Sequence, residues 1–158
     1  KLKERDLLRF QGPYGSFFLR AGSSPVILVA GGTGFAPMQA IIEQVLAAQP
    51  DRPLHLYWGA RARPDLYRHE LAERWAKQHP DFRYTPVLSE PDPADAWSGR
   101  TGFVHQAVLA DYPDLSGCEV YASGPPVMIE SIRREFLARG LPPDHLYSDS
   151  FEFSHDCR

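Results

Sequence analysis

The sequence is poor in cysteine and in metal-ligand spacings. Only two cysteines, Cys118 and Cys157, occur among 158 residues, and neither belongs to a C-x-x-C pair. A disulfide framework and a zinc or iron–sulfur site both require repeated, suitably spaced cysteines, so we expect neither. The six histidines also lack ligand spacing, and His105 is expected at the start of a helix. We therefore predict two plain thiols and no metal site.

Long apolar runs and blocks of basic residues are absent as well. No run approaches the roughly 20 apolar residues that a bilayer span needs, and the charged first six residues are unlike a signal peptide. Lys and Arg are scattered, and the net charge is −3, which argues against a nucleic-acid partner. We expect a cytoplasmic protein with no membrane or nucleic-acid partner. The 43% hydrophobic content is enough for one good core.

A glycine-rich turn, GGTGFAP at residues 31–37, lies between an apolar run at 25–30 and a helical pattern at 38–48. Glycines let backbone N–H groups approach an anion closely, and the helix N-terminus adds partial positive charge. The turn is not a Walker A loop, because no Lys-Ser or Lys-Thr follows it, and its spacing differs from G-x-G-x-x-G. The pattern predicts a nucleotide phosphate site. The alternative is a tight turn that binds no ligand.

The rest of the chain alternates strand and helix patterns. Further strands are predicted at 54–59, 82–88, 119–123 and 145–153, with helices at 67–78 and 104–110 and a last helix that carries residues 128–137 and stops at Gly140. Strands separated by helices predict right-handed crossovers. We therefore expect an α/β fold with a doubly wound, Rossmann-like parallel sheet of five or more strands. Such sheets bind ligands at the carboxyl ends of their strands, where the strand order reverses.

The first twenty residues do not fit this plan. Residues 7–19 show two short strand-like pieces around a Gly-Pro-Tyr-Gly turn, which predicts an antiparallel pair without partner strands in this chain. Because an isolated pair is marginally stable in water, it either rests on the α/β domain or belongs to a barrel. We assign residues 1–22 to the tail of another domain and residues 23–158 to the nucleotide-binding domain.

Several motifs, in this order, resemble those of the ferredoxin–NADP reductase superfamily. They are GPYGSF at 12–17, GGTGFAP at 31–37, SGPP at 123–126 with Met128, and FEF at 151–153. The stretches 56–61, 65–67, 99–104 and 147–151 are most similar to the CDP-6-deoxy-glucoseen reductase and NAD(P)H-flavin reductase branch. Members pair an antiparallel flavin-binding barrel with a nicotinamide-binding α/β domain. The resemblance implies that this chain is the second domain plus a short antiparallel remnant of the barrel.

The resemblance implies binding of NADH or NADPH. Gly31, Gly32, Thr33 and Gly34 would hold the pyrophosphate and the nicotinamide end. The second cofactor-binding motif comprises Gly124, Pro125, Pro126 and Met128. Ser123 stands where many relatives have cysteine beside the nicotinamide, so a catalytic role in orienting the ring is implied, but none that needs a thiol. The alternative is a serine that ends a strand before a Pro-Pro turn.

The resemblance also implies contacts to FAD. Tyr14, Ser16 and Phe151 would contact the flavin, although most of the flavin site and its Arg-x-Tyr-Ser signature are expected upstream of Lys1. Phe151 would also shape the access of the nicotinamide, which is a catalytic role. Phe151 and Phe153 share one side at strand periodicity, and an aromatic face suits stacking on a planar heterocycle. The alternative is a buried core strand.

Three charged residues, Arg61, Arg63 and Asp65, follow the second predicted strand, where dinucleotide folds read the adenosine ribose. Two arginines would clamp a 2′-phosphate, whereas Asp65 would accept a hydrogen bond from a free 2′-hydroxyl and repel that phosphate. The branch resemblance favours NADH, with NADPH open. A solvated charged turn is the third possibility.

The implied function is that of an NAD(P)H-dependent flavin oxidoreductase. Hydride passes from NAD(P)H to flavin, and electrons then reach an acceptor such as an iron–sulfur protein or domain, an oxygenase or free flavin. The flavin domain of the parent chain is then a partner. Two alternatives stay open, namely an isolated nucleotide-binding module without redox turnover and a ligand-free α/β interaction domain.

Overall fold

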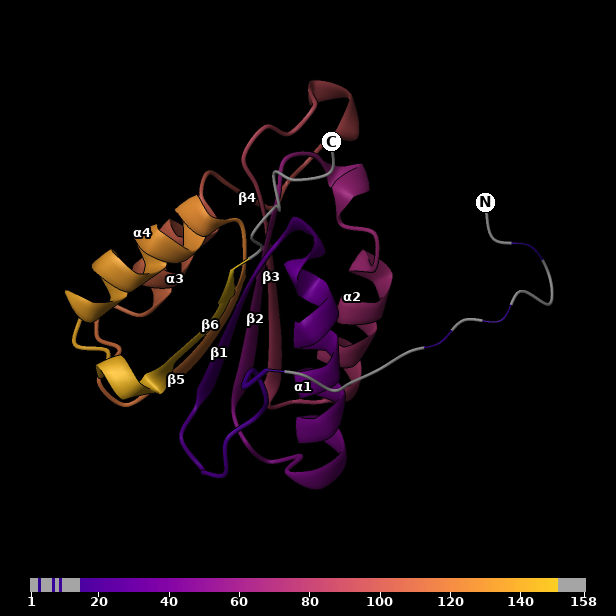
Figure 1. Ribbon diagram of the computed structural model, residues 1–158. Helices are drawn as coiled ribbons and strands as arrows, with labels where there is room; N and C mark the ends of the chain where they lie inside the picture. The colour runs from indigo at the N-terminus through magenta and orange to yellow at the C-terminus, as the bar shows by residue number, and fades with distance from the viewer. Residues whose placement is uncertain (1–2, 4–6, 8, 10–14, 151–158) are drawn as a thin grey trace.

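Six parallel strands form one sheet in the order β4-β3-β2-β1-β5-β6 in the computed structural model, which describes residues 3, 7, 9 and 15–150. The strands are β1 (Val26–Gly31), β2 (Leu54–Ala60), β3 (Phe82–Leu88), β4 (Arg100–Thr101), β5 (Glu119–Gly124) and β6 (Leu146–Ser150). The helices are α1 (Phe35–Ala48), α2 (His69–Gln78), α3 (Val104–Asp111) and α4 (Pro126–Leu137). Figure 1 shows α1 and α2 on one face of the sheet and α3 and α4 on the other. The predicted doubly wound α/β fold is confirmed.

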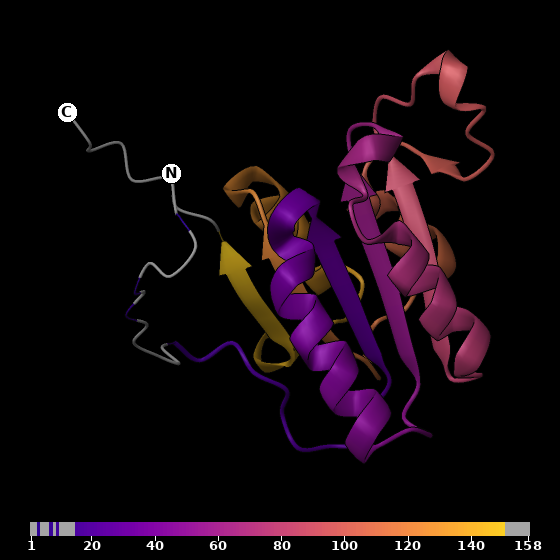
Figure 2. The same ribbon diagram turned by 90° about the vertical axis from the view of Figure 1, so that its right-hand side faces the viewer.

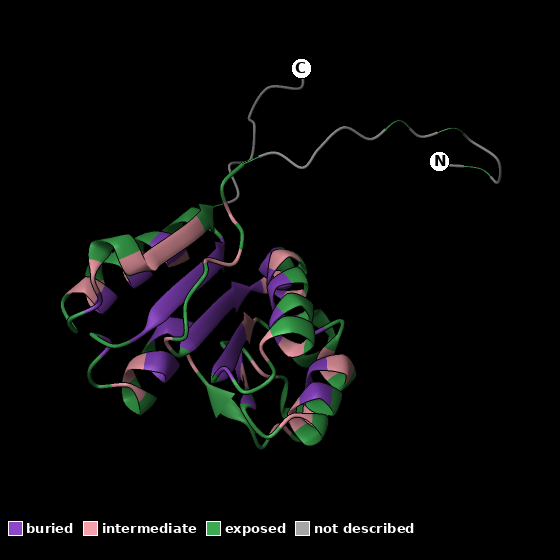
Figure 3. Ribbon diagram, turned by 90° about the horizontal axis from the view of Figure 1, so that it is seen from below, coloured by how far each residue is buried: buried purple, intermediate pink, exposed green. Residues whose placement is uncertain are grey.

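The central strand β1 is buried along its whole length, because β2 and β5 pair with its two edges and helices cover both faces. Alternate side chains enter different cores: Leu28 packs on the α1 and α2 side, whereas Ile27 and Val29 pack on the α3 and α4 side. Figure 3 shows the buried strands between helices whose outer sides are exposed. Burial on both faces explains the unbroken apolar run in the sequence.

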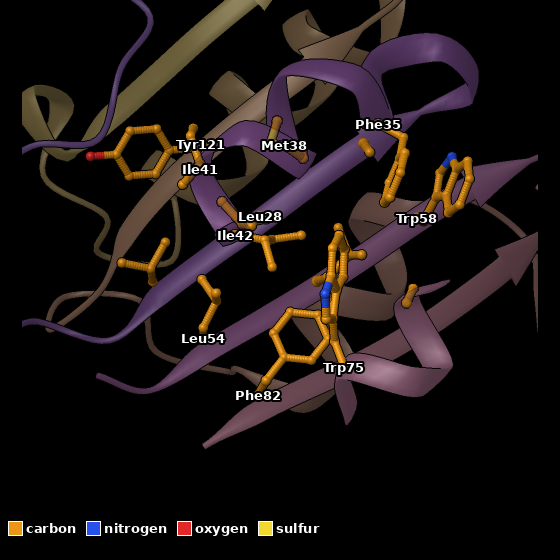
Figure 4. Packing of buried hydrophobic residues seen from close by; sticks show 14 of the residues in the cluster. Leu28, Phe35, Met38, Ile41, Ile42, Leu54, Trp58, Trp75, Phe82 and Tyr121 are labelled. Atoms are coloured by element: carbon orange, nitrogen blue, oxygen red, sulfur yellow. The ribbon is translucent and has the colours of Figure 1, made fainter. Parts of the chain in front are cut away.

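Aromatic rings dominate the core under α1 and α2. Phe35, the first residue of α1, stacks on Trp58 with ring centroids 4.1 Å apart, and Trp75 meets Phe82 edge to face at 6.0 Å (Figure 4). Such pairs contribute about 0.5–1.5 kcal/mol beyond the burial of their area. The Phe35–Trp58 stack joins the start of α1 to the end of β2, and it therefore fixes the glycine turn from one side.

The predicted elements are present with shifted ends. The first helix begins at Phe35 rather than Met38, because Pro37 lies in the first turn, where backbone N–H groups have no intrahelical partner. The helix predicted from Tyr67 begins at His69. The two-residue strand β4 was not predicted, since its exposed residues carry no apolar pattern. Residues 151–153 of the predicted last strand lie outside the described residues.

The predicted antiparallel pair is not formed in the part that the structure describes, because residues 15–25 contain no strand. No neighbouring strand supplies ladder hydrogen bonds there, as expected for an isolated pair. Instead, the segment rests on the α/β domain: Phe17 meets Tyr121 edge to face with ring centroids 6.0 Å apart, and Leu19 packs on the same core. Most of residues 7–14 lie outside the described residues.

Candidate functional site

The sheet reverses its strand order between β1 and β5, and the site lies at the carboxyl ends of these two strands. From β1 the chain winds outward through β2, β3 and β4, and then returns to form β5 on the other side of β1. The connections that follow β1 and β5 therefore lead to opposite faces and leave a crevice between them. A cavity of about 970 Å³ lies there, lined by both glycine turns and by the starts of α3 and α4.

Each of the three glycines of the first turn is needed for a different structural reason. Gly32 has a φ of +52°, a left-handed conformation, and a Cβ there would meet no atom within 4 Å. A Cβ on Gly31 would lie 2.7 Å from the sulfur of Met128. A Cβ on Gly34 would lie 2.0 Å from the carbonyl oxygen of Ser123. Gly32 thus opens onto the cavity, while the other two permit close packing against α4 and β5.

The lining includes Gly31, Gly32 and Thr33, but the buried Gly34 is not part of it. This segment forms a short 3-10 turn, η1 (Gly32–Gly34), that leads directly into α1. Free backbone N–H groups at such a helix start suit an anion. Gly32 is therefore the residue of this turn that leaves room for a ligand, and phosphate binding there stays a prediction.

The second glycine turn forms the opposite wall. Pro125 and Met128 line the cavity, and a Cβ on Gly124 would lie 2.6 Å from the Met128 methyl carbon. Pro126 begins α4 outside the lining. Ser123 is fully buried behind the wall, and its Oγ has no hydrogen-bond partner among the described residues. Buried hydroxyls normally have a partner, so Ser123 leaves one hydrogen bond unmade directly behind the cavity wall, although it is not itself part of the lining.

The charged residues after β2 are not all brought to the cavity. Arg61 and Asp65 line it, whereas Arg63 lines a neighbouring hollow of about 700 Å³. Arg61 donates to Glu90 at 2.8 Å, and both side chains are largely exposed. The Asp65 carboxylate accepts a hydrogen bond of 3.0 Å from the Ala62 backbone N–H. One arginine and one carboxylate therefore remain at this rim, and each already has a protein partner.

Several lining residues were missed by the sequence analysis. Phe103 and Val127 line the cavity although their side chains are 62% and 72% exposed. The Phe103 ring stacks on His105, whose Nε2 lies 3.6 Å from a Glu135 carboxylate oxygen. Burial lowers the pKa of His105, opposed by Glu135, so the imidazole is neutral at pH 7. Its place in the chain could have identified Phe103, since it follows the end of β4 at the same edge of the sheet as the glycine turns.

Of the three predicted flavin contacts, the structure describes Ser16 alone, and Ser16 does not line this cavity. Tyr14 and Phe151 are outside the described residues. Ser16 is exposed, and its carbonyl accepts a 3.0 Å hydrogen bond from the Arg20 guanidinium. Among the described residues, no group of three or more His, Cys, Asp and Glu side chains is arranged to hold a metal ion. None of the described helices combines the length and apolar character needed to cross a membrane.

The cavity fits a nicotinamide dinucleotide. Its volume is at the upper end of the roughly 300–1,000 Å³ typical of small-molecule sites. Open space lies at Gly32, directly before the start of α1, and the unpartnered Ser123 hydroxyl lies at the end of the adjacent strand. In such a site the protein binds and orients the ligand, while a bound cofactor supplies the reactivity.

Comparisons with known proteins agree with this geometry. Residues 28–134 match the family described as "Oxidoreductase NAD-binding domain". The chain is 44% identical over 151 residues to CDP-6-deoxy-L-threo-D-glycero-4-hexulose-3-dehydrase reductase of Yersinia pestis, covering 96% of this chain and 45% of that protein. It is 43% identical to the phenol hydroxylase P5 protein of Acinetobacter pittii, covering 96% and 43%.

Solved structures lead to the same group. The Amycolatopsis cytochrome P450 reductase GcoB superposes with a TM-score of 0.81 at 36% identity, over 89% of this chain and 42% of that one. The ferredoxin reductase of carbazole 1,9a-dioxygenase gives 0.76 at 28% identity, over 89% and 42%. The chain thus spans less than half the length of these relatives. It belongs to the oxidoreductase NAD-binding domain family and has the α/β fold of the ferredoxin reductases.

Proposed function

We propose that this chain is the NAD(P)H-binding part of a flavin-dependent reductase whose FAD is held mostly by residues outside it. The observation that carries the proposal is the left-handed Gly32, which opens onto the cavity at the start of α1. When bound, the cofactors supply the redox chemistry, in which a hydride passes from nicotinamide C4 to flavin N5. The chain's own residues bind and orient the nicotinamide.

Each site residue then has a separate task. The backbone of Gly32 and Thr33 binds the pyrophosphate, with Gly31 and Gly34 giving the turn its close packing. Pro125 and Met128 form the wall against the nicotinamide, and Gly124 and Pro126, on either side of Pro125, give the turn its shape. The Ser123 hydroxyl orients that ring, a role supported by its burial without a partner. Tyr14, Ser16 and Phe151 contact the flavin, in keeping with the domain assignment of residues 1–22 and 23–158.

NADH is the proposed coenzyme. Asp65 lines the cavity and would repel a 2′-phosphate, while Arg61 is already paired with Glu90. Arg63 lies outside the lining, and the other lining arginine, Arg134, is paired with Glu135 on α4, so neither joins Arg61 in a clamp after β2. The electron acceptor is an iron–sulfur protein or domain, or an oxygenase, as the names of the hydroxylase, dioxygenase and P450 reductase relatives suggest. The proposed location is the cytoplasm.

Calorimetric titration of the chain with NADH, NADPH and ADP-ribose tests the binding part of the proposal. We expect NADH and ADP-ribose to bind and NADPH to bind more weakly. The redox part is tested by anaerobic mixing of the full-length flavoprotein with NADH, which should bleach the flavin absorbance. Binding without bleaching would support the alternative of a nucleotide-binding module, and an absence of binding would reject both.

A further inference from the structure

A buried ion pair lies at the end of the sheet opposite the cavity, and the proposed function does not use it. Arg52, in the turn before β2, and Glu119, the first residue of β5, are 67 positions apart in sequence. Their Nη2 and Oε1 atoms are 2.9 Å apart, and the side chains are 3% and 8% exposed. Buried charges are costly unless further hydrogen bonds satisfy them, so the other partners of this pair are informative.

One further partner is the Gln49 side-chain oxygen, which accepts from Arg52 Nη1 at 3.3 Å. The other partners of Arg52 belong to residues 16–24, which we call the connecting segment. Arg52 Nε donates to the Ser24 carbonyl at 2.9 Å, and Arg52 Nη1 donates to the Arg20 carbonyl at 3.3 Å. At Gly22 the chain passes directly over the carboxylate, because a Cβ there would lie 2.8 Å from Glu119 Oε1. The ion pair therefore holds the backbone of a segment that has no strand or helix of its own.

Tyr121 connects the same carboxylate to the segment by a second route. Its hydroxyl donates to Glu119 Oε2 at 3.3 Å and accepts from the Arg20 amide at 2.8 Å. The Arg20 guanidinium in turn lies over the rings of Phe18 and Tyr147, at 3.9 and 5.2 Å from their centroids. Figure 2 shows the segment running past β6 toward the end of the sheet that is opposite the strand arrowheads.

We propose that Arg52, Glu119 and Tyr121 are positioning residues that join the connecting segment rigidly to the nucleotide-binding domain. The inference rests on the proposed function: the flavin-binding part precedes this segment in the chain, so its orientation toward the cavity depends on how the segment is held. Hydride transfer requires donor and acceptor atoms about 3–3.5 Å apart, and a displacement of about 1 Å can cost a hundredfold in rate.

The test uses the full-length flavoprotein and two mild variants, Tyr121→Phe and Arg52→Lys. The first removes one hydroxyl, and the second keeps a positive charge opposite Glu119 but loses the fork that reaches Ser24 and Arg20. Tyr57→Phe is the matched control, because Tyr57 is also a fully buried strand tyrosine, yet its hydroxyl bonds to Asp111 on the other face. Both variants keep the pair's charges, so folding is expected to persist.

Three quantities are compared: hydrogen exchange in the connecting segment, the dissociation constant of ADP-ribose, and the rate of flavin reduction at saturating NADH. In Tyr121→Phe and Arg52→Lys, exchange of the Arg20 amide should accelerate about tenfold, as loss of a buried hydrogen bond predicts. Flavin reduction should slow about tenfold, because the reacting atoms are less well aligned. ADP-ribose affinity should stay within about twofold, and Tyr57→Phe should match wild type in exchange and rate.

Wild-type exchange and wild-type reduction rates in both variants would overturn the inference. An equal loss of ADP-ribose affinity and reduction rate would also overturn it, since the residues would then act on the cavity itself. Failure of the wild-type protein to bind ADP-ribose or to bleach its flavin would instead contradict the proposed function. In that case the exchange comparison still decides whether these residues fix the segment.

Discussion

The indole Nε1 of Trp58 donates a 2.9 Å hydrogen bond to the carbonyl oxygen of Gly32. Trp58 is fully buried at the end of β2, and its ring stacks on Phe35 at the start of α1. The indole thus fixes the orientation of the peptide group that follows Gly32. Gly32 is the residue of the glycine turn that opens onto the cavity. Trp58, which does not line the cavity, therefore supports the shape of the proposed pyrophosphate site.

Replacing this donor tests that support. Trp58→Phe keeps an aromatic ring but loses the N–H, so we expect ADP-ribose to bind about three- to tenfold more weakly, as one net hydrogen bond predicts. AMP, which lacks the pyrophosphate, should lose less affinity. Calorimetric titration measures both. Trp75→Phe is the control, since Trp75 belongs to the same core but meets Phe82 instead of the turn; equal losses in both variants would contradict the assignment.

The glycines of the turn should respond differently to alanine. Gly32→Ala projects a methyl group into open space at a left-handed φ, so the stability cost should be about 1–2 kcal/mol while NADH binding falls at least about tenfold. Gly34→Ala collides with the Ser123 carbonyl and should lower stability by more than about 3 kcal/mol. Urea unfolding and NADH titration separate the effects. Gly117→Ala, which meets no atom, is the control. Unchanged NADH affinity in Gly32→Ala would remove the turn from the site.

Coenzyme preference should depend on Asp65 and not on Arg63. Asp65→Asn removes the negative charge and keeps an oxygen that can accept from the Ala62 amide, so NADPH should improve relative to NADH by about tenfold. Arg63→Ala should leave the ratio of the two dissociation constants unchanged, because Arg63 lies outside the cavity lining. If Arg63→Ala weakens NADPH selectively, the proposed coenzyme site is misplaced.

Ser123→Ala separates binding from orientation. Because the Ser123 Oγ is buried without a partner, its removal should leave the stability of the ligand-free protein unchanged or slightly raised. In the full-length flavoprotein, flavin reduction should slow several-fold while NADH affinity changes less. Stopped-flow absorbance measures the rate. A wild-type rate would mean that Ser123 only ends a strand.

Acid should destabilise the domain through His55. Burial, with smaller opposing and assisting effects from Asp111, Arg83 and Arg100, lowers the pKa of His55 from 6.5 to about 4. The unfolded chain therefore binds a proton at His55 more readily than the folded chain does. The contribution of the neutral, buried His55 to the free energy of unfolding is fully present above pH 6.5 and is lost as the pH falls toward 4. The loss is on the order of 3 kcal/mol. Urea unfolding at pH 7 and 4.5 should show a smaller pH dependence in His55→Gln; equal slopes would contradict the assignment.

The sequence predicted most of the fold because its signals are local. An apolar run, a glycine turn and a helical pattern in succession defined β1 and α1, and the same alternation defined the other main elements. The edge strand β4 escaped prediction, since two exposed residues have no periodicity to detect. The strand-like piece near residue 17 is not a strand in the described residues 15–25, where no described strand pairs with it, and strand formation needs such a neighbour.

By itself the sequence determined the α/β class and the place of the glycine turn at a strand-to-helix junction, because both follow from patterns within about ten residues. Only the tertiary structure decided which glycine opens onto the cavity, that Arg61 and Asp65 reach it without Arg63, and that Trp58 holds the turn. It also paired Arg52 with Glu119 beneath the connecting segment. These relationships join residues from separate strands, and the sheet order that brings them together is fixed by long-range packing.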